Sequence, residues 1–334
     1  YRAEEERVIT VDKAPATNRN LGYTIEQIYK LQEYFGTKPT RREGDPCLKV
    51  AVQSFKGGVA KSVTAVHLAQ FLALKGYRVL VADFDPQASA TNSFGFVADT
   101  VFTESNTLLP YIKGDKEDIR YCIMDTYFPG IKLIPSCLPF YDAEFHLAFS
   151  AARSESDEDR IACFTEFVDA FKTIEKDFDM IIFDSPPALG MITINILAAA
   201  DGLIVPTTPA FFDFSSTIQY FKMVQKVLKK IIGGKKYNFI KILATRVDSR
   251  NPTHEDFIPI MRDVFGTSMM RSIFYNTNEI DNCSSEFKTV YDLDHPNKRA
   301  SKILNDIFSE IELEILKWWP SRVKKMVEEE IILE

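Results

Sequence analysis

The stretch LKVAVQSFKGGVAKSVTAVHLAQFLALKG, residues 48–76, carries the strongest structural signal in this chain of 334 residues. It begins with a largely apolar run at 48–52, which is typical of a short buried strand. A glycine-containing turn follows, and the apolar spacing then predicts a helix over about 62–75, which Gly76 ends. A second apolar run at 79–83 completes a strand–helix–strand unit. This unit predicts parallel strands covered by helices.

Further apolar runs extend the same pattern along the chain. Candidate buried strands lie at 180–183, 202–205 and 239–243, separated by stretches with helical spacing. We therefore expect an α/β fold with a doubly wound, mostly parallel sheet and helices on both faces. A last amphipathic helix over about 298–318 has isoleucines at steps of four and should pack on this domain.

The segment before the sheet is short. Residues 1–20 are polar, and Thr24 is suited to cap a helix that Gly36 ends. We divide the chain into an N-terminal extension with one helix and a linker (1–47), a main α/β domain (48–318) and a charged C-terminal tail (319–334).

Composition restricts the class of protein. The chain is 46% hydrophobic and 26% charged, which fits a folded globular protein rather than a disordered one. No apolar run reaches the roughly 18 residues of a membrane-spanning helix. The five cysteines are scattered and form no C-x-x-C pair, which argues against a disulfide scaffold or zinc ribbon and suits a reducing cytosol. A net charge of −7 argues against a surface coated with nucleic-acid-binding charge.

The segment FKGGVAKS, residues 55–62, is a P-loop with two departures. Against the usual G-x-x-x-x-G-K-[ST], Lys61 and Ser62 fit, whereas Phe55 and Ala60 take the two glycine positions. The Cβ of Ala60 requires a compatible φ angle, which bears on the geometry of the loop. A simple strand-to-helix turn with nearby lysines is the alternative reading of this segment.

The loop nevertheless has the chemistry of a phosphate site. Gly57 and Gly58 let backbone N–H groups approach phosphate oxygens, and the following helix N-terminus adds partial positive charge. Lys61 can reach the β and γ oxygens, while the Ser62 hydroxyl can hold Mg²⁺. The expected nucleotide-binding residues of the loop are Gly57, Gly58, Val59, Ala60, Lys61, Ser62 and Val63.

Three aspartates lie where apolar strands end. Asp83 and Asp85 follow the second strand, and Asp184 follows the third. Carboxylates at this edge of a doubly wound sheet face the crevice where ligands bind. Because Mg²⁺ prefers oxygen ligands and retains several waters, we take Ser62, Asp83 and Asp184 as metal candidates, with Asp184 acting through water. Asp83 could equally support the metal site without contacting the ion.

The motifs together resemble one family. The strings KGGVAKS (56–62), DFDPQ (83–87) and DSPP (184–187) are similar to those of the deviant Walker A ATPases of the ParA and MinD superfamily. The likeness runs from about residue 22 to 318 and is closest to the long (type Ia) plasmid partition ParA proteins and to RepA of repABC replicons. It implies a P-loop NTPase fold and a weak ATP hydrolase that uses ATP and Mg²⁺.

The resemblance also implies roles for individual residues. It implies that Lys56 crosses the interface of an ATP-sandwiched homodimer, and that Asp85 positions the attacking water, so the catalytic candidates are Lys56, Lys61 and Asp85. Thr245 and Arg246 fall where the family contacts adenine. The same resemblance implies stimulation by a ParB-like centromere-binding partner, non-specific DNA binding, and a bacterial, cytoplasmic and nucleoid-associated location.

A basic segment provides independent support for DNA binding. Residues 221–250 hold nine Lys and Arg side chains against the single acid Asp248, which gives 9 − 1 = +8 on a protein of −7. Such asymmetry is typical of contact with a phosphate backbone, although a solvated helix face is the alternative. The candidate DNA-binding residues are Lys226, Lys229, Lys230, Lys235 and Lys236.

Two other functions remain open at this point. A MinD-like membrane-positioning ATPase needs a basic amphipathic C-terminal helix, whereas the tail here is mostly acidic, so no membrane partner is expected. A nucleotide-dependent DNA-binding regulator with negligible hydrolysis is compatible with Ala60 in the loop. Long ParA proteins carry an N-terminal winged helix-turn-helix, for which 47 residues are too few. The extension could be a remnant of a DNA-binding region, and operator recognition is not expected from it.

Overall fold

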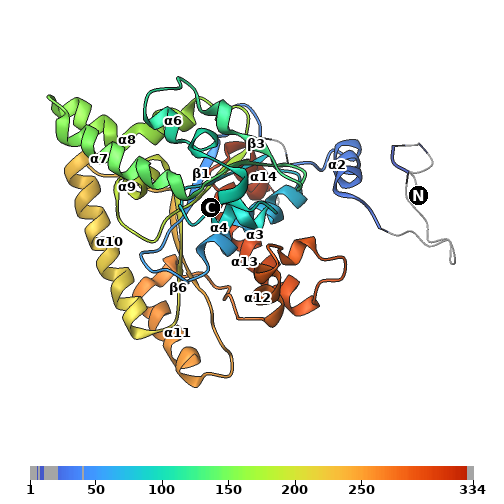
Figure 1. Cartoon of the computed structure of the whole chain (residues 1–334). Helices are drawn as coiled ribbons and strands as arrows, with labels where there is room; N and C mark the ends of the chain where they lie inside the picture. The colour runs from blue at the N-terminus through green and yellow to red at the C-terminus, as the bar shows by residue number, and fades with distance from the viewer. Residues whose placement is uncertain (1–5, 7, 11–21, 40, 329–334) are drawn as a thin grey trace.

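A twisted sheet forms the centre of the molecule. The computed structural model describes residues 6, 8–10, 22–39 and 41–328, and within them the sheet has seven strands in the order β3-β4-β2-β5-β1-β6-β7 (Figure 1). The strands are β1 (Leu48–Val52), β2 (Val79–Asp83), β3 (Met124–Asp125), β4 (Ile131–Ile134), β5 (Met180–Asp184), β6 (Gly202–Thr207) and β7 (Phe239–Ala244). Only β3 is antiparallel to its neighbour, so the predicted doubly wound, mostly parallel fold is confirmed.

Helices cover both faces of the sheet, because successive strand residues point to opposite sides. In β1, Ala51 packs in one hydrophobic core, whereas Val50 and Val52 pack in the other. The first core lies under α7 (Tyr141–Arg153), α8 (Asp157–Lys172), α9 (Met191–Ala199), α10 (Phe211–Ile232) and α11 (Pro252–Phe265). The second lies under α3 (Lys61–Lys75), α12 (Asn278–Ser285) and α13 (Lys298–Leu316).

The predicted elements match the structure closely. The strands expected at 48–52 and 79–83 agree with β1 and β2 at both ends, and the other three are one or two residues longer than expected. The helix expected over 62–75 begins one residue earlier, at Lys61. Short elements were not predicted: β3, β4, α4 (Ser89–Ser93), α5 (Ala98–Val101) and α6 (Leu109–Ile112).

The N-terminal helix is also confirmed, as α2 (Ile25–Tyr34). Thr24 caps it reciprocally with Gln27: the Thr24 N–H donates to Gln27 Oε1 at 2.8 Å, and Thr24 Oγ1 accepts from the Gln27 N–H at 3.3 Å. The Tyr29 hydroxyl donates to the carbonyl of Ala73 in α3 at 2.7 Å. A polar contact therefore joins the extension to the body of the protein.

The C-terminal region continues beyond the expected last helix. After α13, the Trp319 side chain is fully buried, and its Nε1–H donates to the carbonyl oxygen of Pro46 at 3.0 Å. A further helix, α14 (Pro320–Glu328), begins there, inside the segment expected to be a charged tail; residues 329–334 of that tail lie outside the described residues. In the described part of the chain, we find no helix with the length and apolar character needed to span a bilayer.

Candidate nucleotide-binding and catalytic site

The loop between β1 and α3 has an open, donor-rich geometry. Gly58 adopts φ +74°, and Ala60, which precedes α3, adopts φ +67° without capping the helix through its side chain. The first turn of α3 carries no acidic residue. Nothing lies within 4 Å of a Cβ built on Gly57 or Gly58, so their backbone faces open space. The first amides of α3 and the glycine backbone therefore suit an anion.

Lys61 lies inside this loop. Its side chain is largely buried, and Nζ donates to the carbonyl oxygen of Lys56 at 3.2 Å. Burial lowers the pKa of the Lys61 ammonium, and the charges of Asp184 and Asp85 oppose that shift. The structure thus brings Lys61 together with two of the three predicted aspartates.

Asp83 and Asp184 lie directly opposite each other on neighbouring strands β2 and β5. Asp83 accepts hydrogen bonds from the Thr91 hydroxyl at 2.7 Å, the Thr91 N–H at 2.8 Å and the Asp85 N–H at 3.1 Å. Burial nevertheless raises the pKa of Asp83 to about 7. Because its oxygens already accept hydrogen bonds from the protein, Asp83 is suited to support the site rather than to contact a metal.

Asp184 is in the opposite situation. It is fully buried, and within the described residues neither carboxylate oxygen has a hydrogen bond of normal geometry. Burial, reinforced by the charge of Asp83, raises its pKa, while the nearby Ser62 hydroxyl and Lys61 act against that rise. A buried carboxylate with so little compensation favours a bound cation, and the oxygens of Ser62 and Asp184 are ligands that suit Mg²⁺. Of the three predicted magnesium residues, Ser62 and Asp184 therefore suit the ion and Asp83 does not, and binding of the ion stays a prediction.

Lys56 is engaged within its own chain. Its ammonium forms an ion pair with the Asp213 carboxylate in the first turn of α10, and the Thr208 hydroxyl donates to the same carboxylate. The Lys56 side chain is 55% exposed, whereas that of Asp213 is 8% exposed. Asp213 was assigned no role from the sequence.

Thr245 and Arg246 follow β7 at the same edge of the sheet. The buried Thr245 hydroxyl donates to the carbonyl oxygen of Val59 at 3.0 Å, so it ties the end of β7 to the phosphate loop. Arg246 is exposed and adopts φ +52°. Contact of either residue with adenine stays a prediction.

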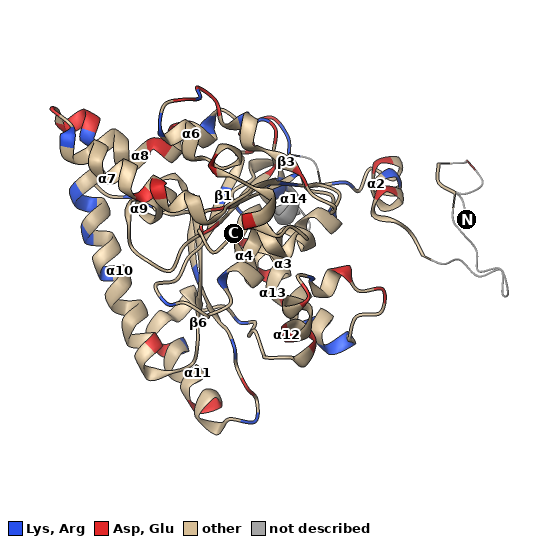
Figure 2. Ribbon diagram, in the orientation of Figure 1, with Lys and Arg blue, Asp and Glu red and all other residues tan. Residues whose placement is uncertain are grey.

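The basic segment divides into groups with different surroundings. Four lysines are exposed at helical steps of four, three and one along α10, where Figure 2 shows blue segments of the ribbon. We call them the α10 lysine face, which consists of Lys222, Lys226, Lys229 and Lys230. Lys235 is separate from them, because its ammonium donates to the carbonyl oxygen of Ala198 at the end of α9, at 2.8 Å. Lys236 is exposed. The structure thus keeps Lys226, Lys229 and Lys230 together and turns Lys235 inward.

Comparisons with known proteins agree with these motifs. The family model described as an AAA domain matches residues 48–236. Protein SopA of Escherichia coli K12 is 36% identical over 278 residues, covering 82% of this chain and 70% of its own length. A putative replication protein A of Rhizobium rhizogenes is 30% identical over 336 residues, covering 95% of this chain and 82% of its own length.

Solved structures support the fold. A putative plasmid partition protein of Borrelia burgdorferi bound to AMPPNP superposes with a TM-score of 0.64 at 21% identity, covering 80% of this chain and 99% of that one. The septum site-determining protein MinD of Pyrococcus horikoshii with Mg-ADP gives a TM-score of 0.59 at 19% identity, covering 79% and 96%. The chain therefore belongs to the ParA/MinD superfamily of P-loop ATPases, near the plasmid partition ParA proteins, as its motifs predict.

Proposed function

We propose that this ParA-type ATPase hydrolyses ATP with Mg²⁺ and thereby drives the partition of a plasmid or chromosome. The observation that carries the proposal is the buried carboxylate of Asp184, which has no cation paired with it among the described residues and lies beside Ser62 and Lys61 under an open phosphate loop. The similarity to SopA, and to a partition protein solved with AMPPNP, supports both the nucleotide and the process.

Each residue of the site then has a distinct task. The amides around Gly57 and Gly58 and the ammonium of Lys61 hold phosphate oxygens, while Ser62 and, through water, Asp184 hold the metal. Bound Mg²⁺ neutralises part of the charge on the transferred phosphoryl group. Asp85 orients the attacking water.

The active form in this proposal is an ATP-bound homodimer. Lys56 would leave Asp213 and reach the phosphates held by the partner subunit. The surface around this lysine supports contact with a second copy: Phe55 is 47% exposed, and Phe211 and Phe212, which precede Asp213, are 66% and 80% exposed. Large exposed apolar side chains gathered at one place are typical of an interaction surface.

DNA binding without sequence preference is assigned to the α10 lysine face. Beyond Asp213, α10 has no acidic residue, so no carboxylate on the same helix neutralises these lysines. Contact with DNA phosphates releases counterions, and binding should therefore weaken steeply with salt. A bacterial, cytoplasmic and nucleoid-associated location follows from this role.

Turnover by the chain alone is expected to be slow. An arginine supplied by a partner can raise the rate of a P-loop NTPase by about 10³–10⁵, and we propose a ParB-like centromere-binding protein as the stimulating partner. A purely regulatory ATP-binding role would instead leave turnover negligible with that partner present.

The proposal is tested by measuring DNA retention and ATP turnover in parallel, for the native chain and for Lys61→Ala. We expect retention that requires ATP and is lost in the variant. Retention that is the same with and without ATP, in both proteins, would contradict a nucleotide-dependent switch.

A further inference from the structure

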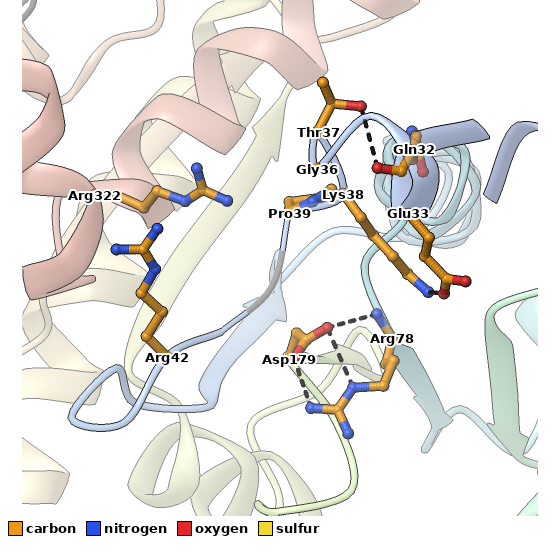
Figure 3. Close-up of a pocket in the computed structure, with 11 residues that line it drawn as sticks. Gln32, Glu33, Gly36, Thr37, Lys38, Pro39, Arg42, Arg78, Asp179 and Arg322 are labelled. Atoms are coloured by element: carbon orange, nitrogen blue, oxygen red, sulfur yellow. Dashed lines mark hydrogen bonds and ion pairs between the residues drawn. The ribbon is translucent and has the colours of Figure 1, made fainter. Parts of the chain in front are cut away.

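A pocket of about 860 Å³ lies between the loop after α2, the start of α14 and the beginnings of two strands (Figure 3). Arg78 immediately precedes β2 and Asp179 immediately precedes β5, and both line the pocket. The phosphate loop follows the end of β1, which is parallel to β5. The pocket therefore lies at the opposite edge of the sheet and is separate from the nucleotide site.

The pocket has an excess of positive charge. Each of its two acids is already paired with a cation, at N–O distances of 2.6 and 2.7 Å, and Figure 3 draws both pairs; the pairs are Lys38 with Glu33, and Arg78 with Asp179. Two further arginines, Arg42 and Arg322, line the same pocket. Among the residues that the structure describes, neither guanidinium group has an ion pair or hydrogen bond.

The carboxylate of Asp45, which is 7% exposed, joins the two segments of backbone that carry these arginines. It accepts hydrogen bonds from the Arg42 N–H at 2.9 Å, the Ser321 N–H at 3.0 Å and the Ser321 hydroxyl at 2.5 Å. The backbone before β1 is thereby fixed to the first turn of α14. Arg42 and Arg322, which are 280 positions apart in the sequence, thus lie on the two segments that Asp45 joins.

Charge balance at this junction is incomplete. Although burial opposes the shift, the hydrogen bonds from Ser321 and Arg42, together with the charge of Arg322, lower the pKa of Asp45. Asp45 therefore stays ionised and offsets one positive charge. These two guanidinium groups and the Asp45 carboxylate alone sum to 2 − 1 = +1, on a protein whose net charge is −7.

An anion would relieve this imbalance. Guanidinium groups are planar donors that bind phosphate through two parallel hydrogen bonds, and fixing in advance the backbone segments that carry them reduces the entropy lost on binding. We propose that Arg42 and Arg322 form a second phosphate-binding site, which holds a phosphate group of a small phosphorylated molecule or of the DNA backbone.

Pyrophosphate is the probe for a small ligand. It is titrated by calorimetry into the native chain saturated with ADP and Mg²⁺, so that the phosphate loop is already filled. The same titration uses Arg42→Gln/Arg322→Gln and a charge-matched control, Arg271→Gln/Arg299→Gln, whose exposed arginines lie outside the pocket. We expect at least about a tenfold loss of affinity in the first variant only.

A second titration, with a DNA duplex of arbitrary sequence, tests whether the phosphate group belongs to the DNA backbone. If the group belongs to DNA, the double variant loses one phosphate contact and should reduce the magnitude of the slope of log affinity against log salt by about 0.9, and the control should not. A change with pyrophosphate alone assigns the site to a small molecule. Equal responses of all three proteins to both probes would overturn the proposal. Circular dichroism checks folding, and the single exposed variant Arg42→Gln serves if the double variant unfolds.

Discussion

Lys56 and Asp213 form an ion pair that joins the phosphate loop to the first turn of α10 across 157 positions of sequence. The carboxylate is nearly buried and also receives the Thr208 hydroxyl, whereas half of the lysine side chain is exposed. In the proposed dimer Lys56 serves the partner subunit, so the pair must break before the dimer forms. The pair therefore favours the monomer.

Asp213→Asn should lower the ATP concentration needed for dimerisation by several-fold. The amide keeps a group that can accept from Thr208 but removes the charge that holds Lys56, and a partly exposed ion pair contributes about 1 kcal/mol. Light scattering over an ATP titration measures the midpoint. Asp248→Asn, which breaks the exposed pair with Arg250, is the control. An unchanged midpoint, or loss of the dimer, would show that Asp213 does not restrain Lys56.

Stabilisation by Mg²⁺ and ATP should increase with pH. Burial raises the pKa of Asp83 to about 7 and also raises that of Asp184, so both carboxyls bind protons more strongly in the folded state. Without a metal, the free energy of unfolding therefore falls as pH rises from about 4 to 7. A cation that replaces these protons then stabilises more at higher pH.

The measurement is the shift in melting temperature caused by Mg²⁺ and ATP at about pH 6 and about pH 8. The larger shift is expected at the higher pH. Asp184→Asn should abolish most of it, while Asp142→Asn on the exposed surface of α7 should leave it intact. A shift that is independent of pH would argue against a cation bound beside the buried pair.

Lysines of the basic segment should separate into two classes when they are neutralised. Each of Lys226→Gln, Lys229→Gln and Lys230→Gln should weaken DNA binding and lower the salt slope by about 0.9 if its phosphate contact is lost. Lys235→Gln should chiefly lower thermal stability, because its ammonium satisfies the Ala198 carbonyl. If Lys235→Gln weakens DNA binding as much as the others, the division is wrong.

Ala60→Gly should stabilise the protein by about 1 kcal/mol, because a left-handed φ is costly for a residue with a Cβ. Chemical denaturation measures the change. Ala69→Gly, in the buried middle of α3, is the contrasting variant and should destabilise. A destabilising effect of Ala60→Gly would mean that the loop is not strained at this position. If ATP turnover is unaffected, Ala60 does not explain a slow enzyme.

The limits of sequence reasoning are visible at particular residues. The ends of β1 and β2 could be predicted because their apolar runs are flanked by turn residues. The location of the aspartates could be predicted because the carboxyl ends of parallel strands lie at the same edge of the sheet. The partner of Lys56 could not be found, because only the fold brings Asp213 to it. Charge counting placed Lys235 with the other lysines, since composition carries no information on which way a side chain points.

The most direct test is a calorimetric titration of the native chain with ATP, first with Mg²⁺ and then with a chelator. The same titration is made with Lys61→Ala and with a control variant, Lys75→Ala, at the far end of α3. We predict one ATP per chain for the native protein and the control, weaker binding without Mg²⁺, and binding reduced by at least about 10²-fold in Lys61→Ala. No heat of binding at millimolar ATP with Mg²⁺, or equal binding by Lys61→Ala, would contradict the assignment of the loop as the triphosphate site.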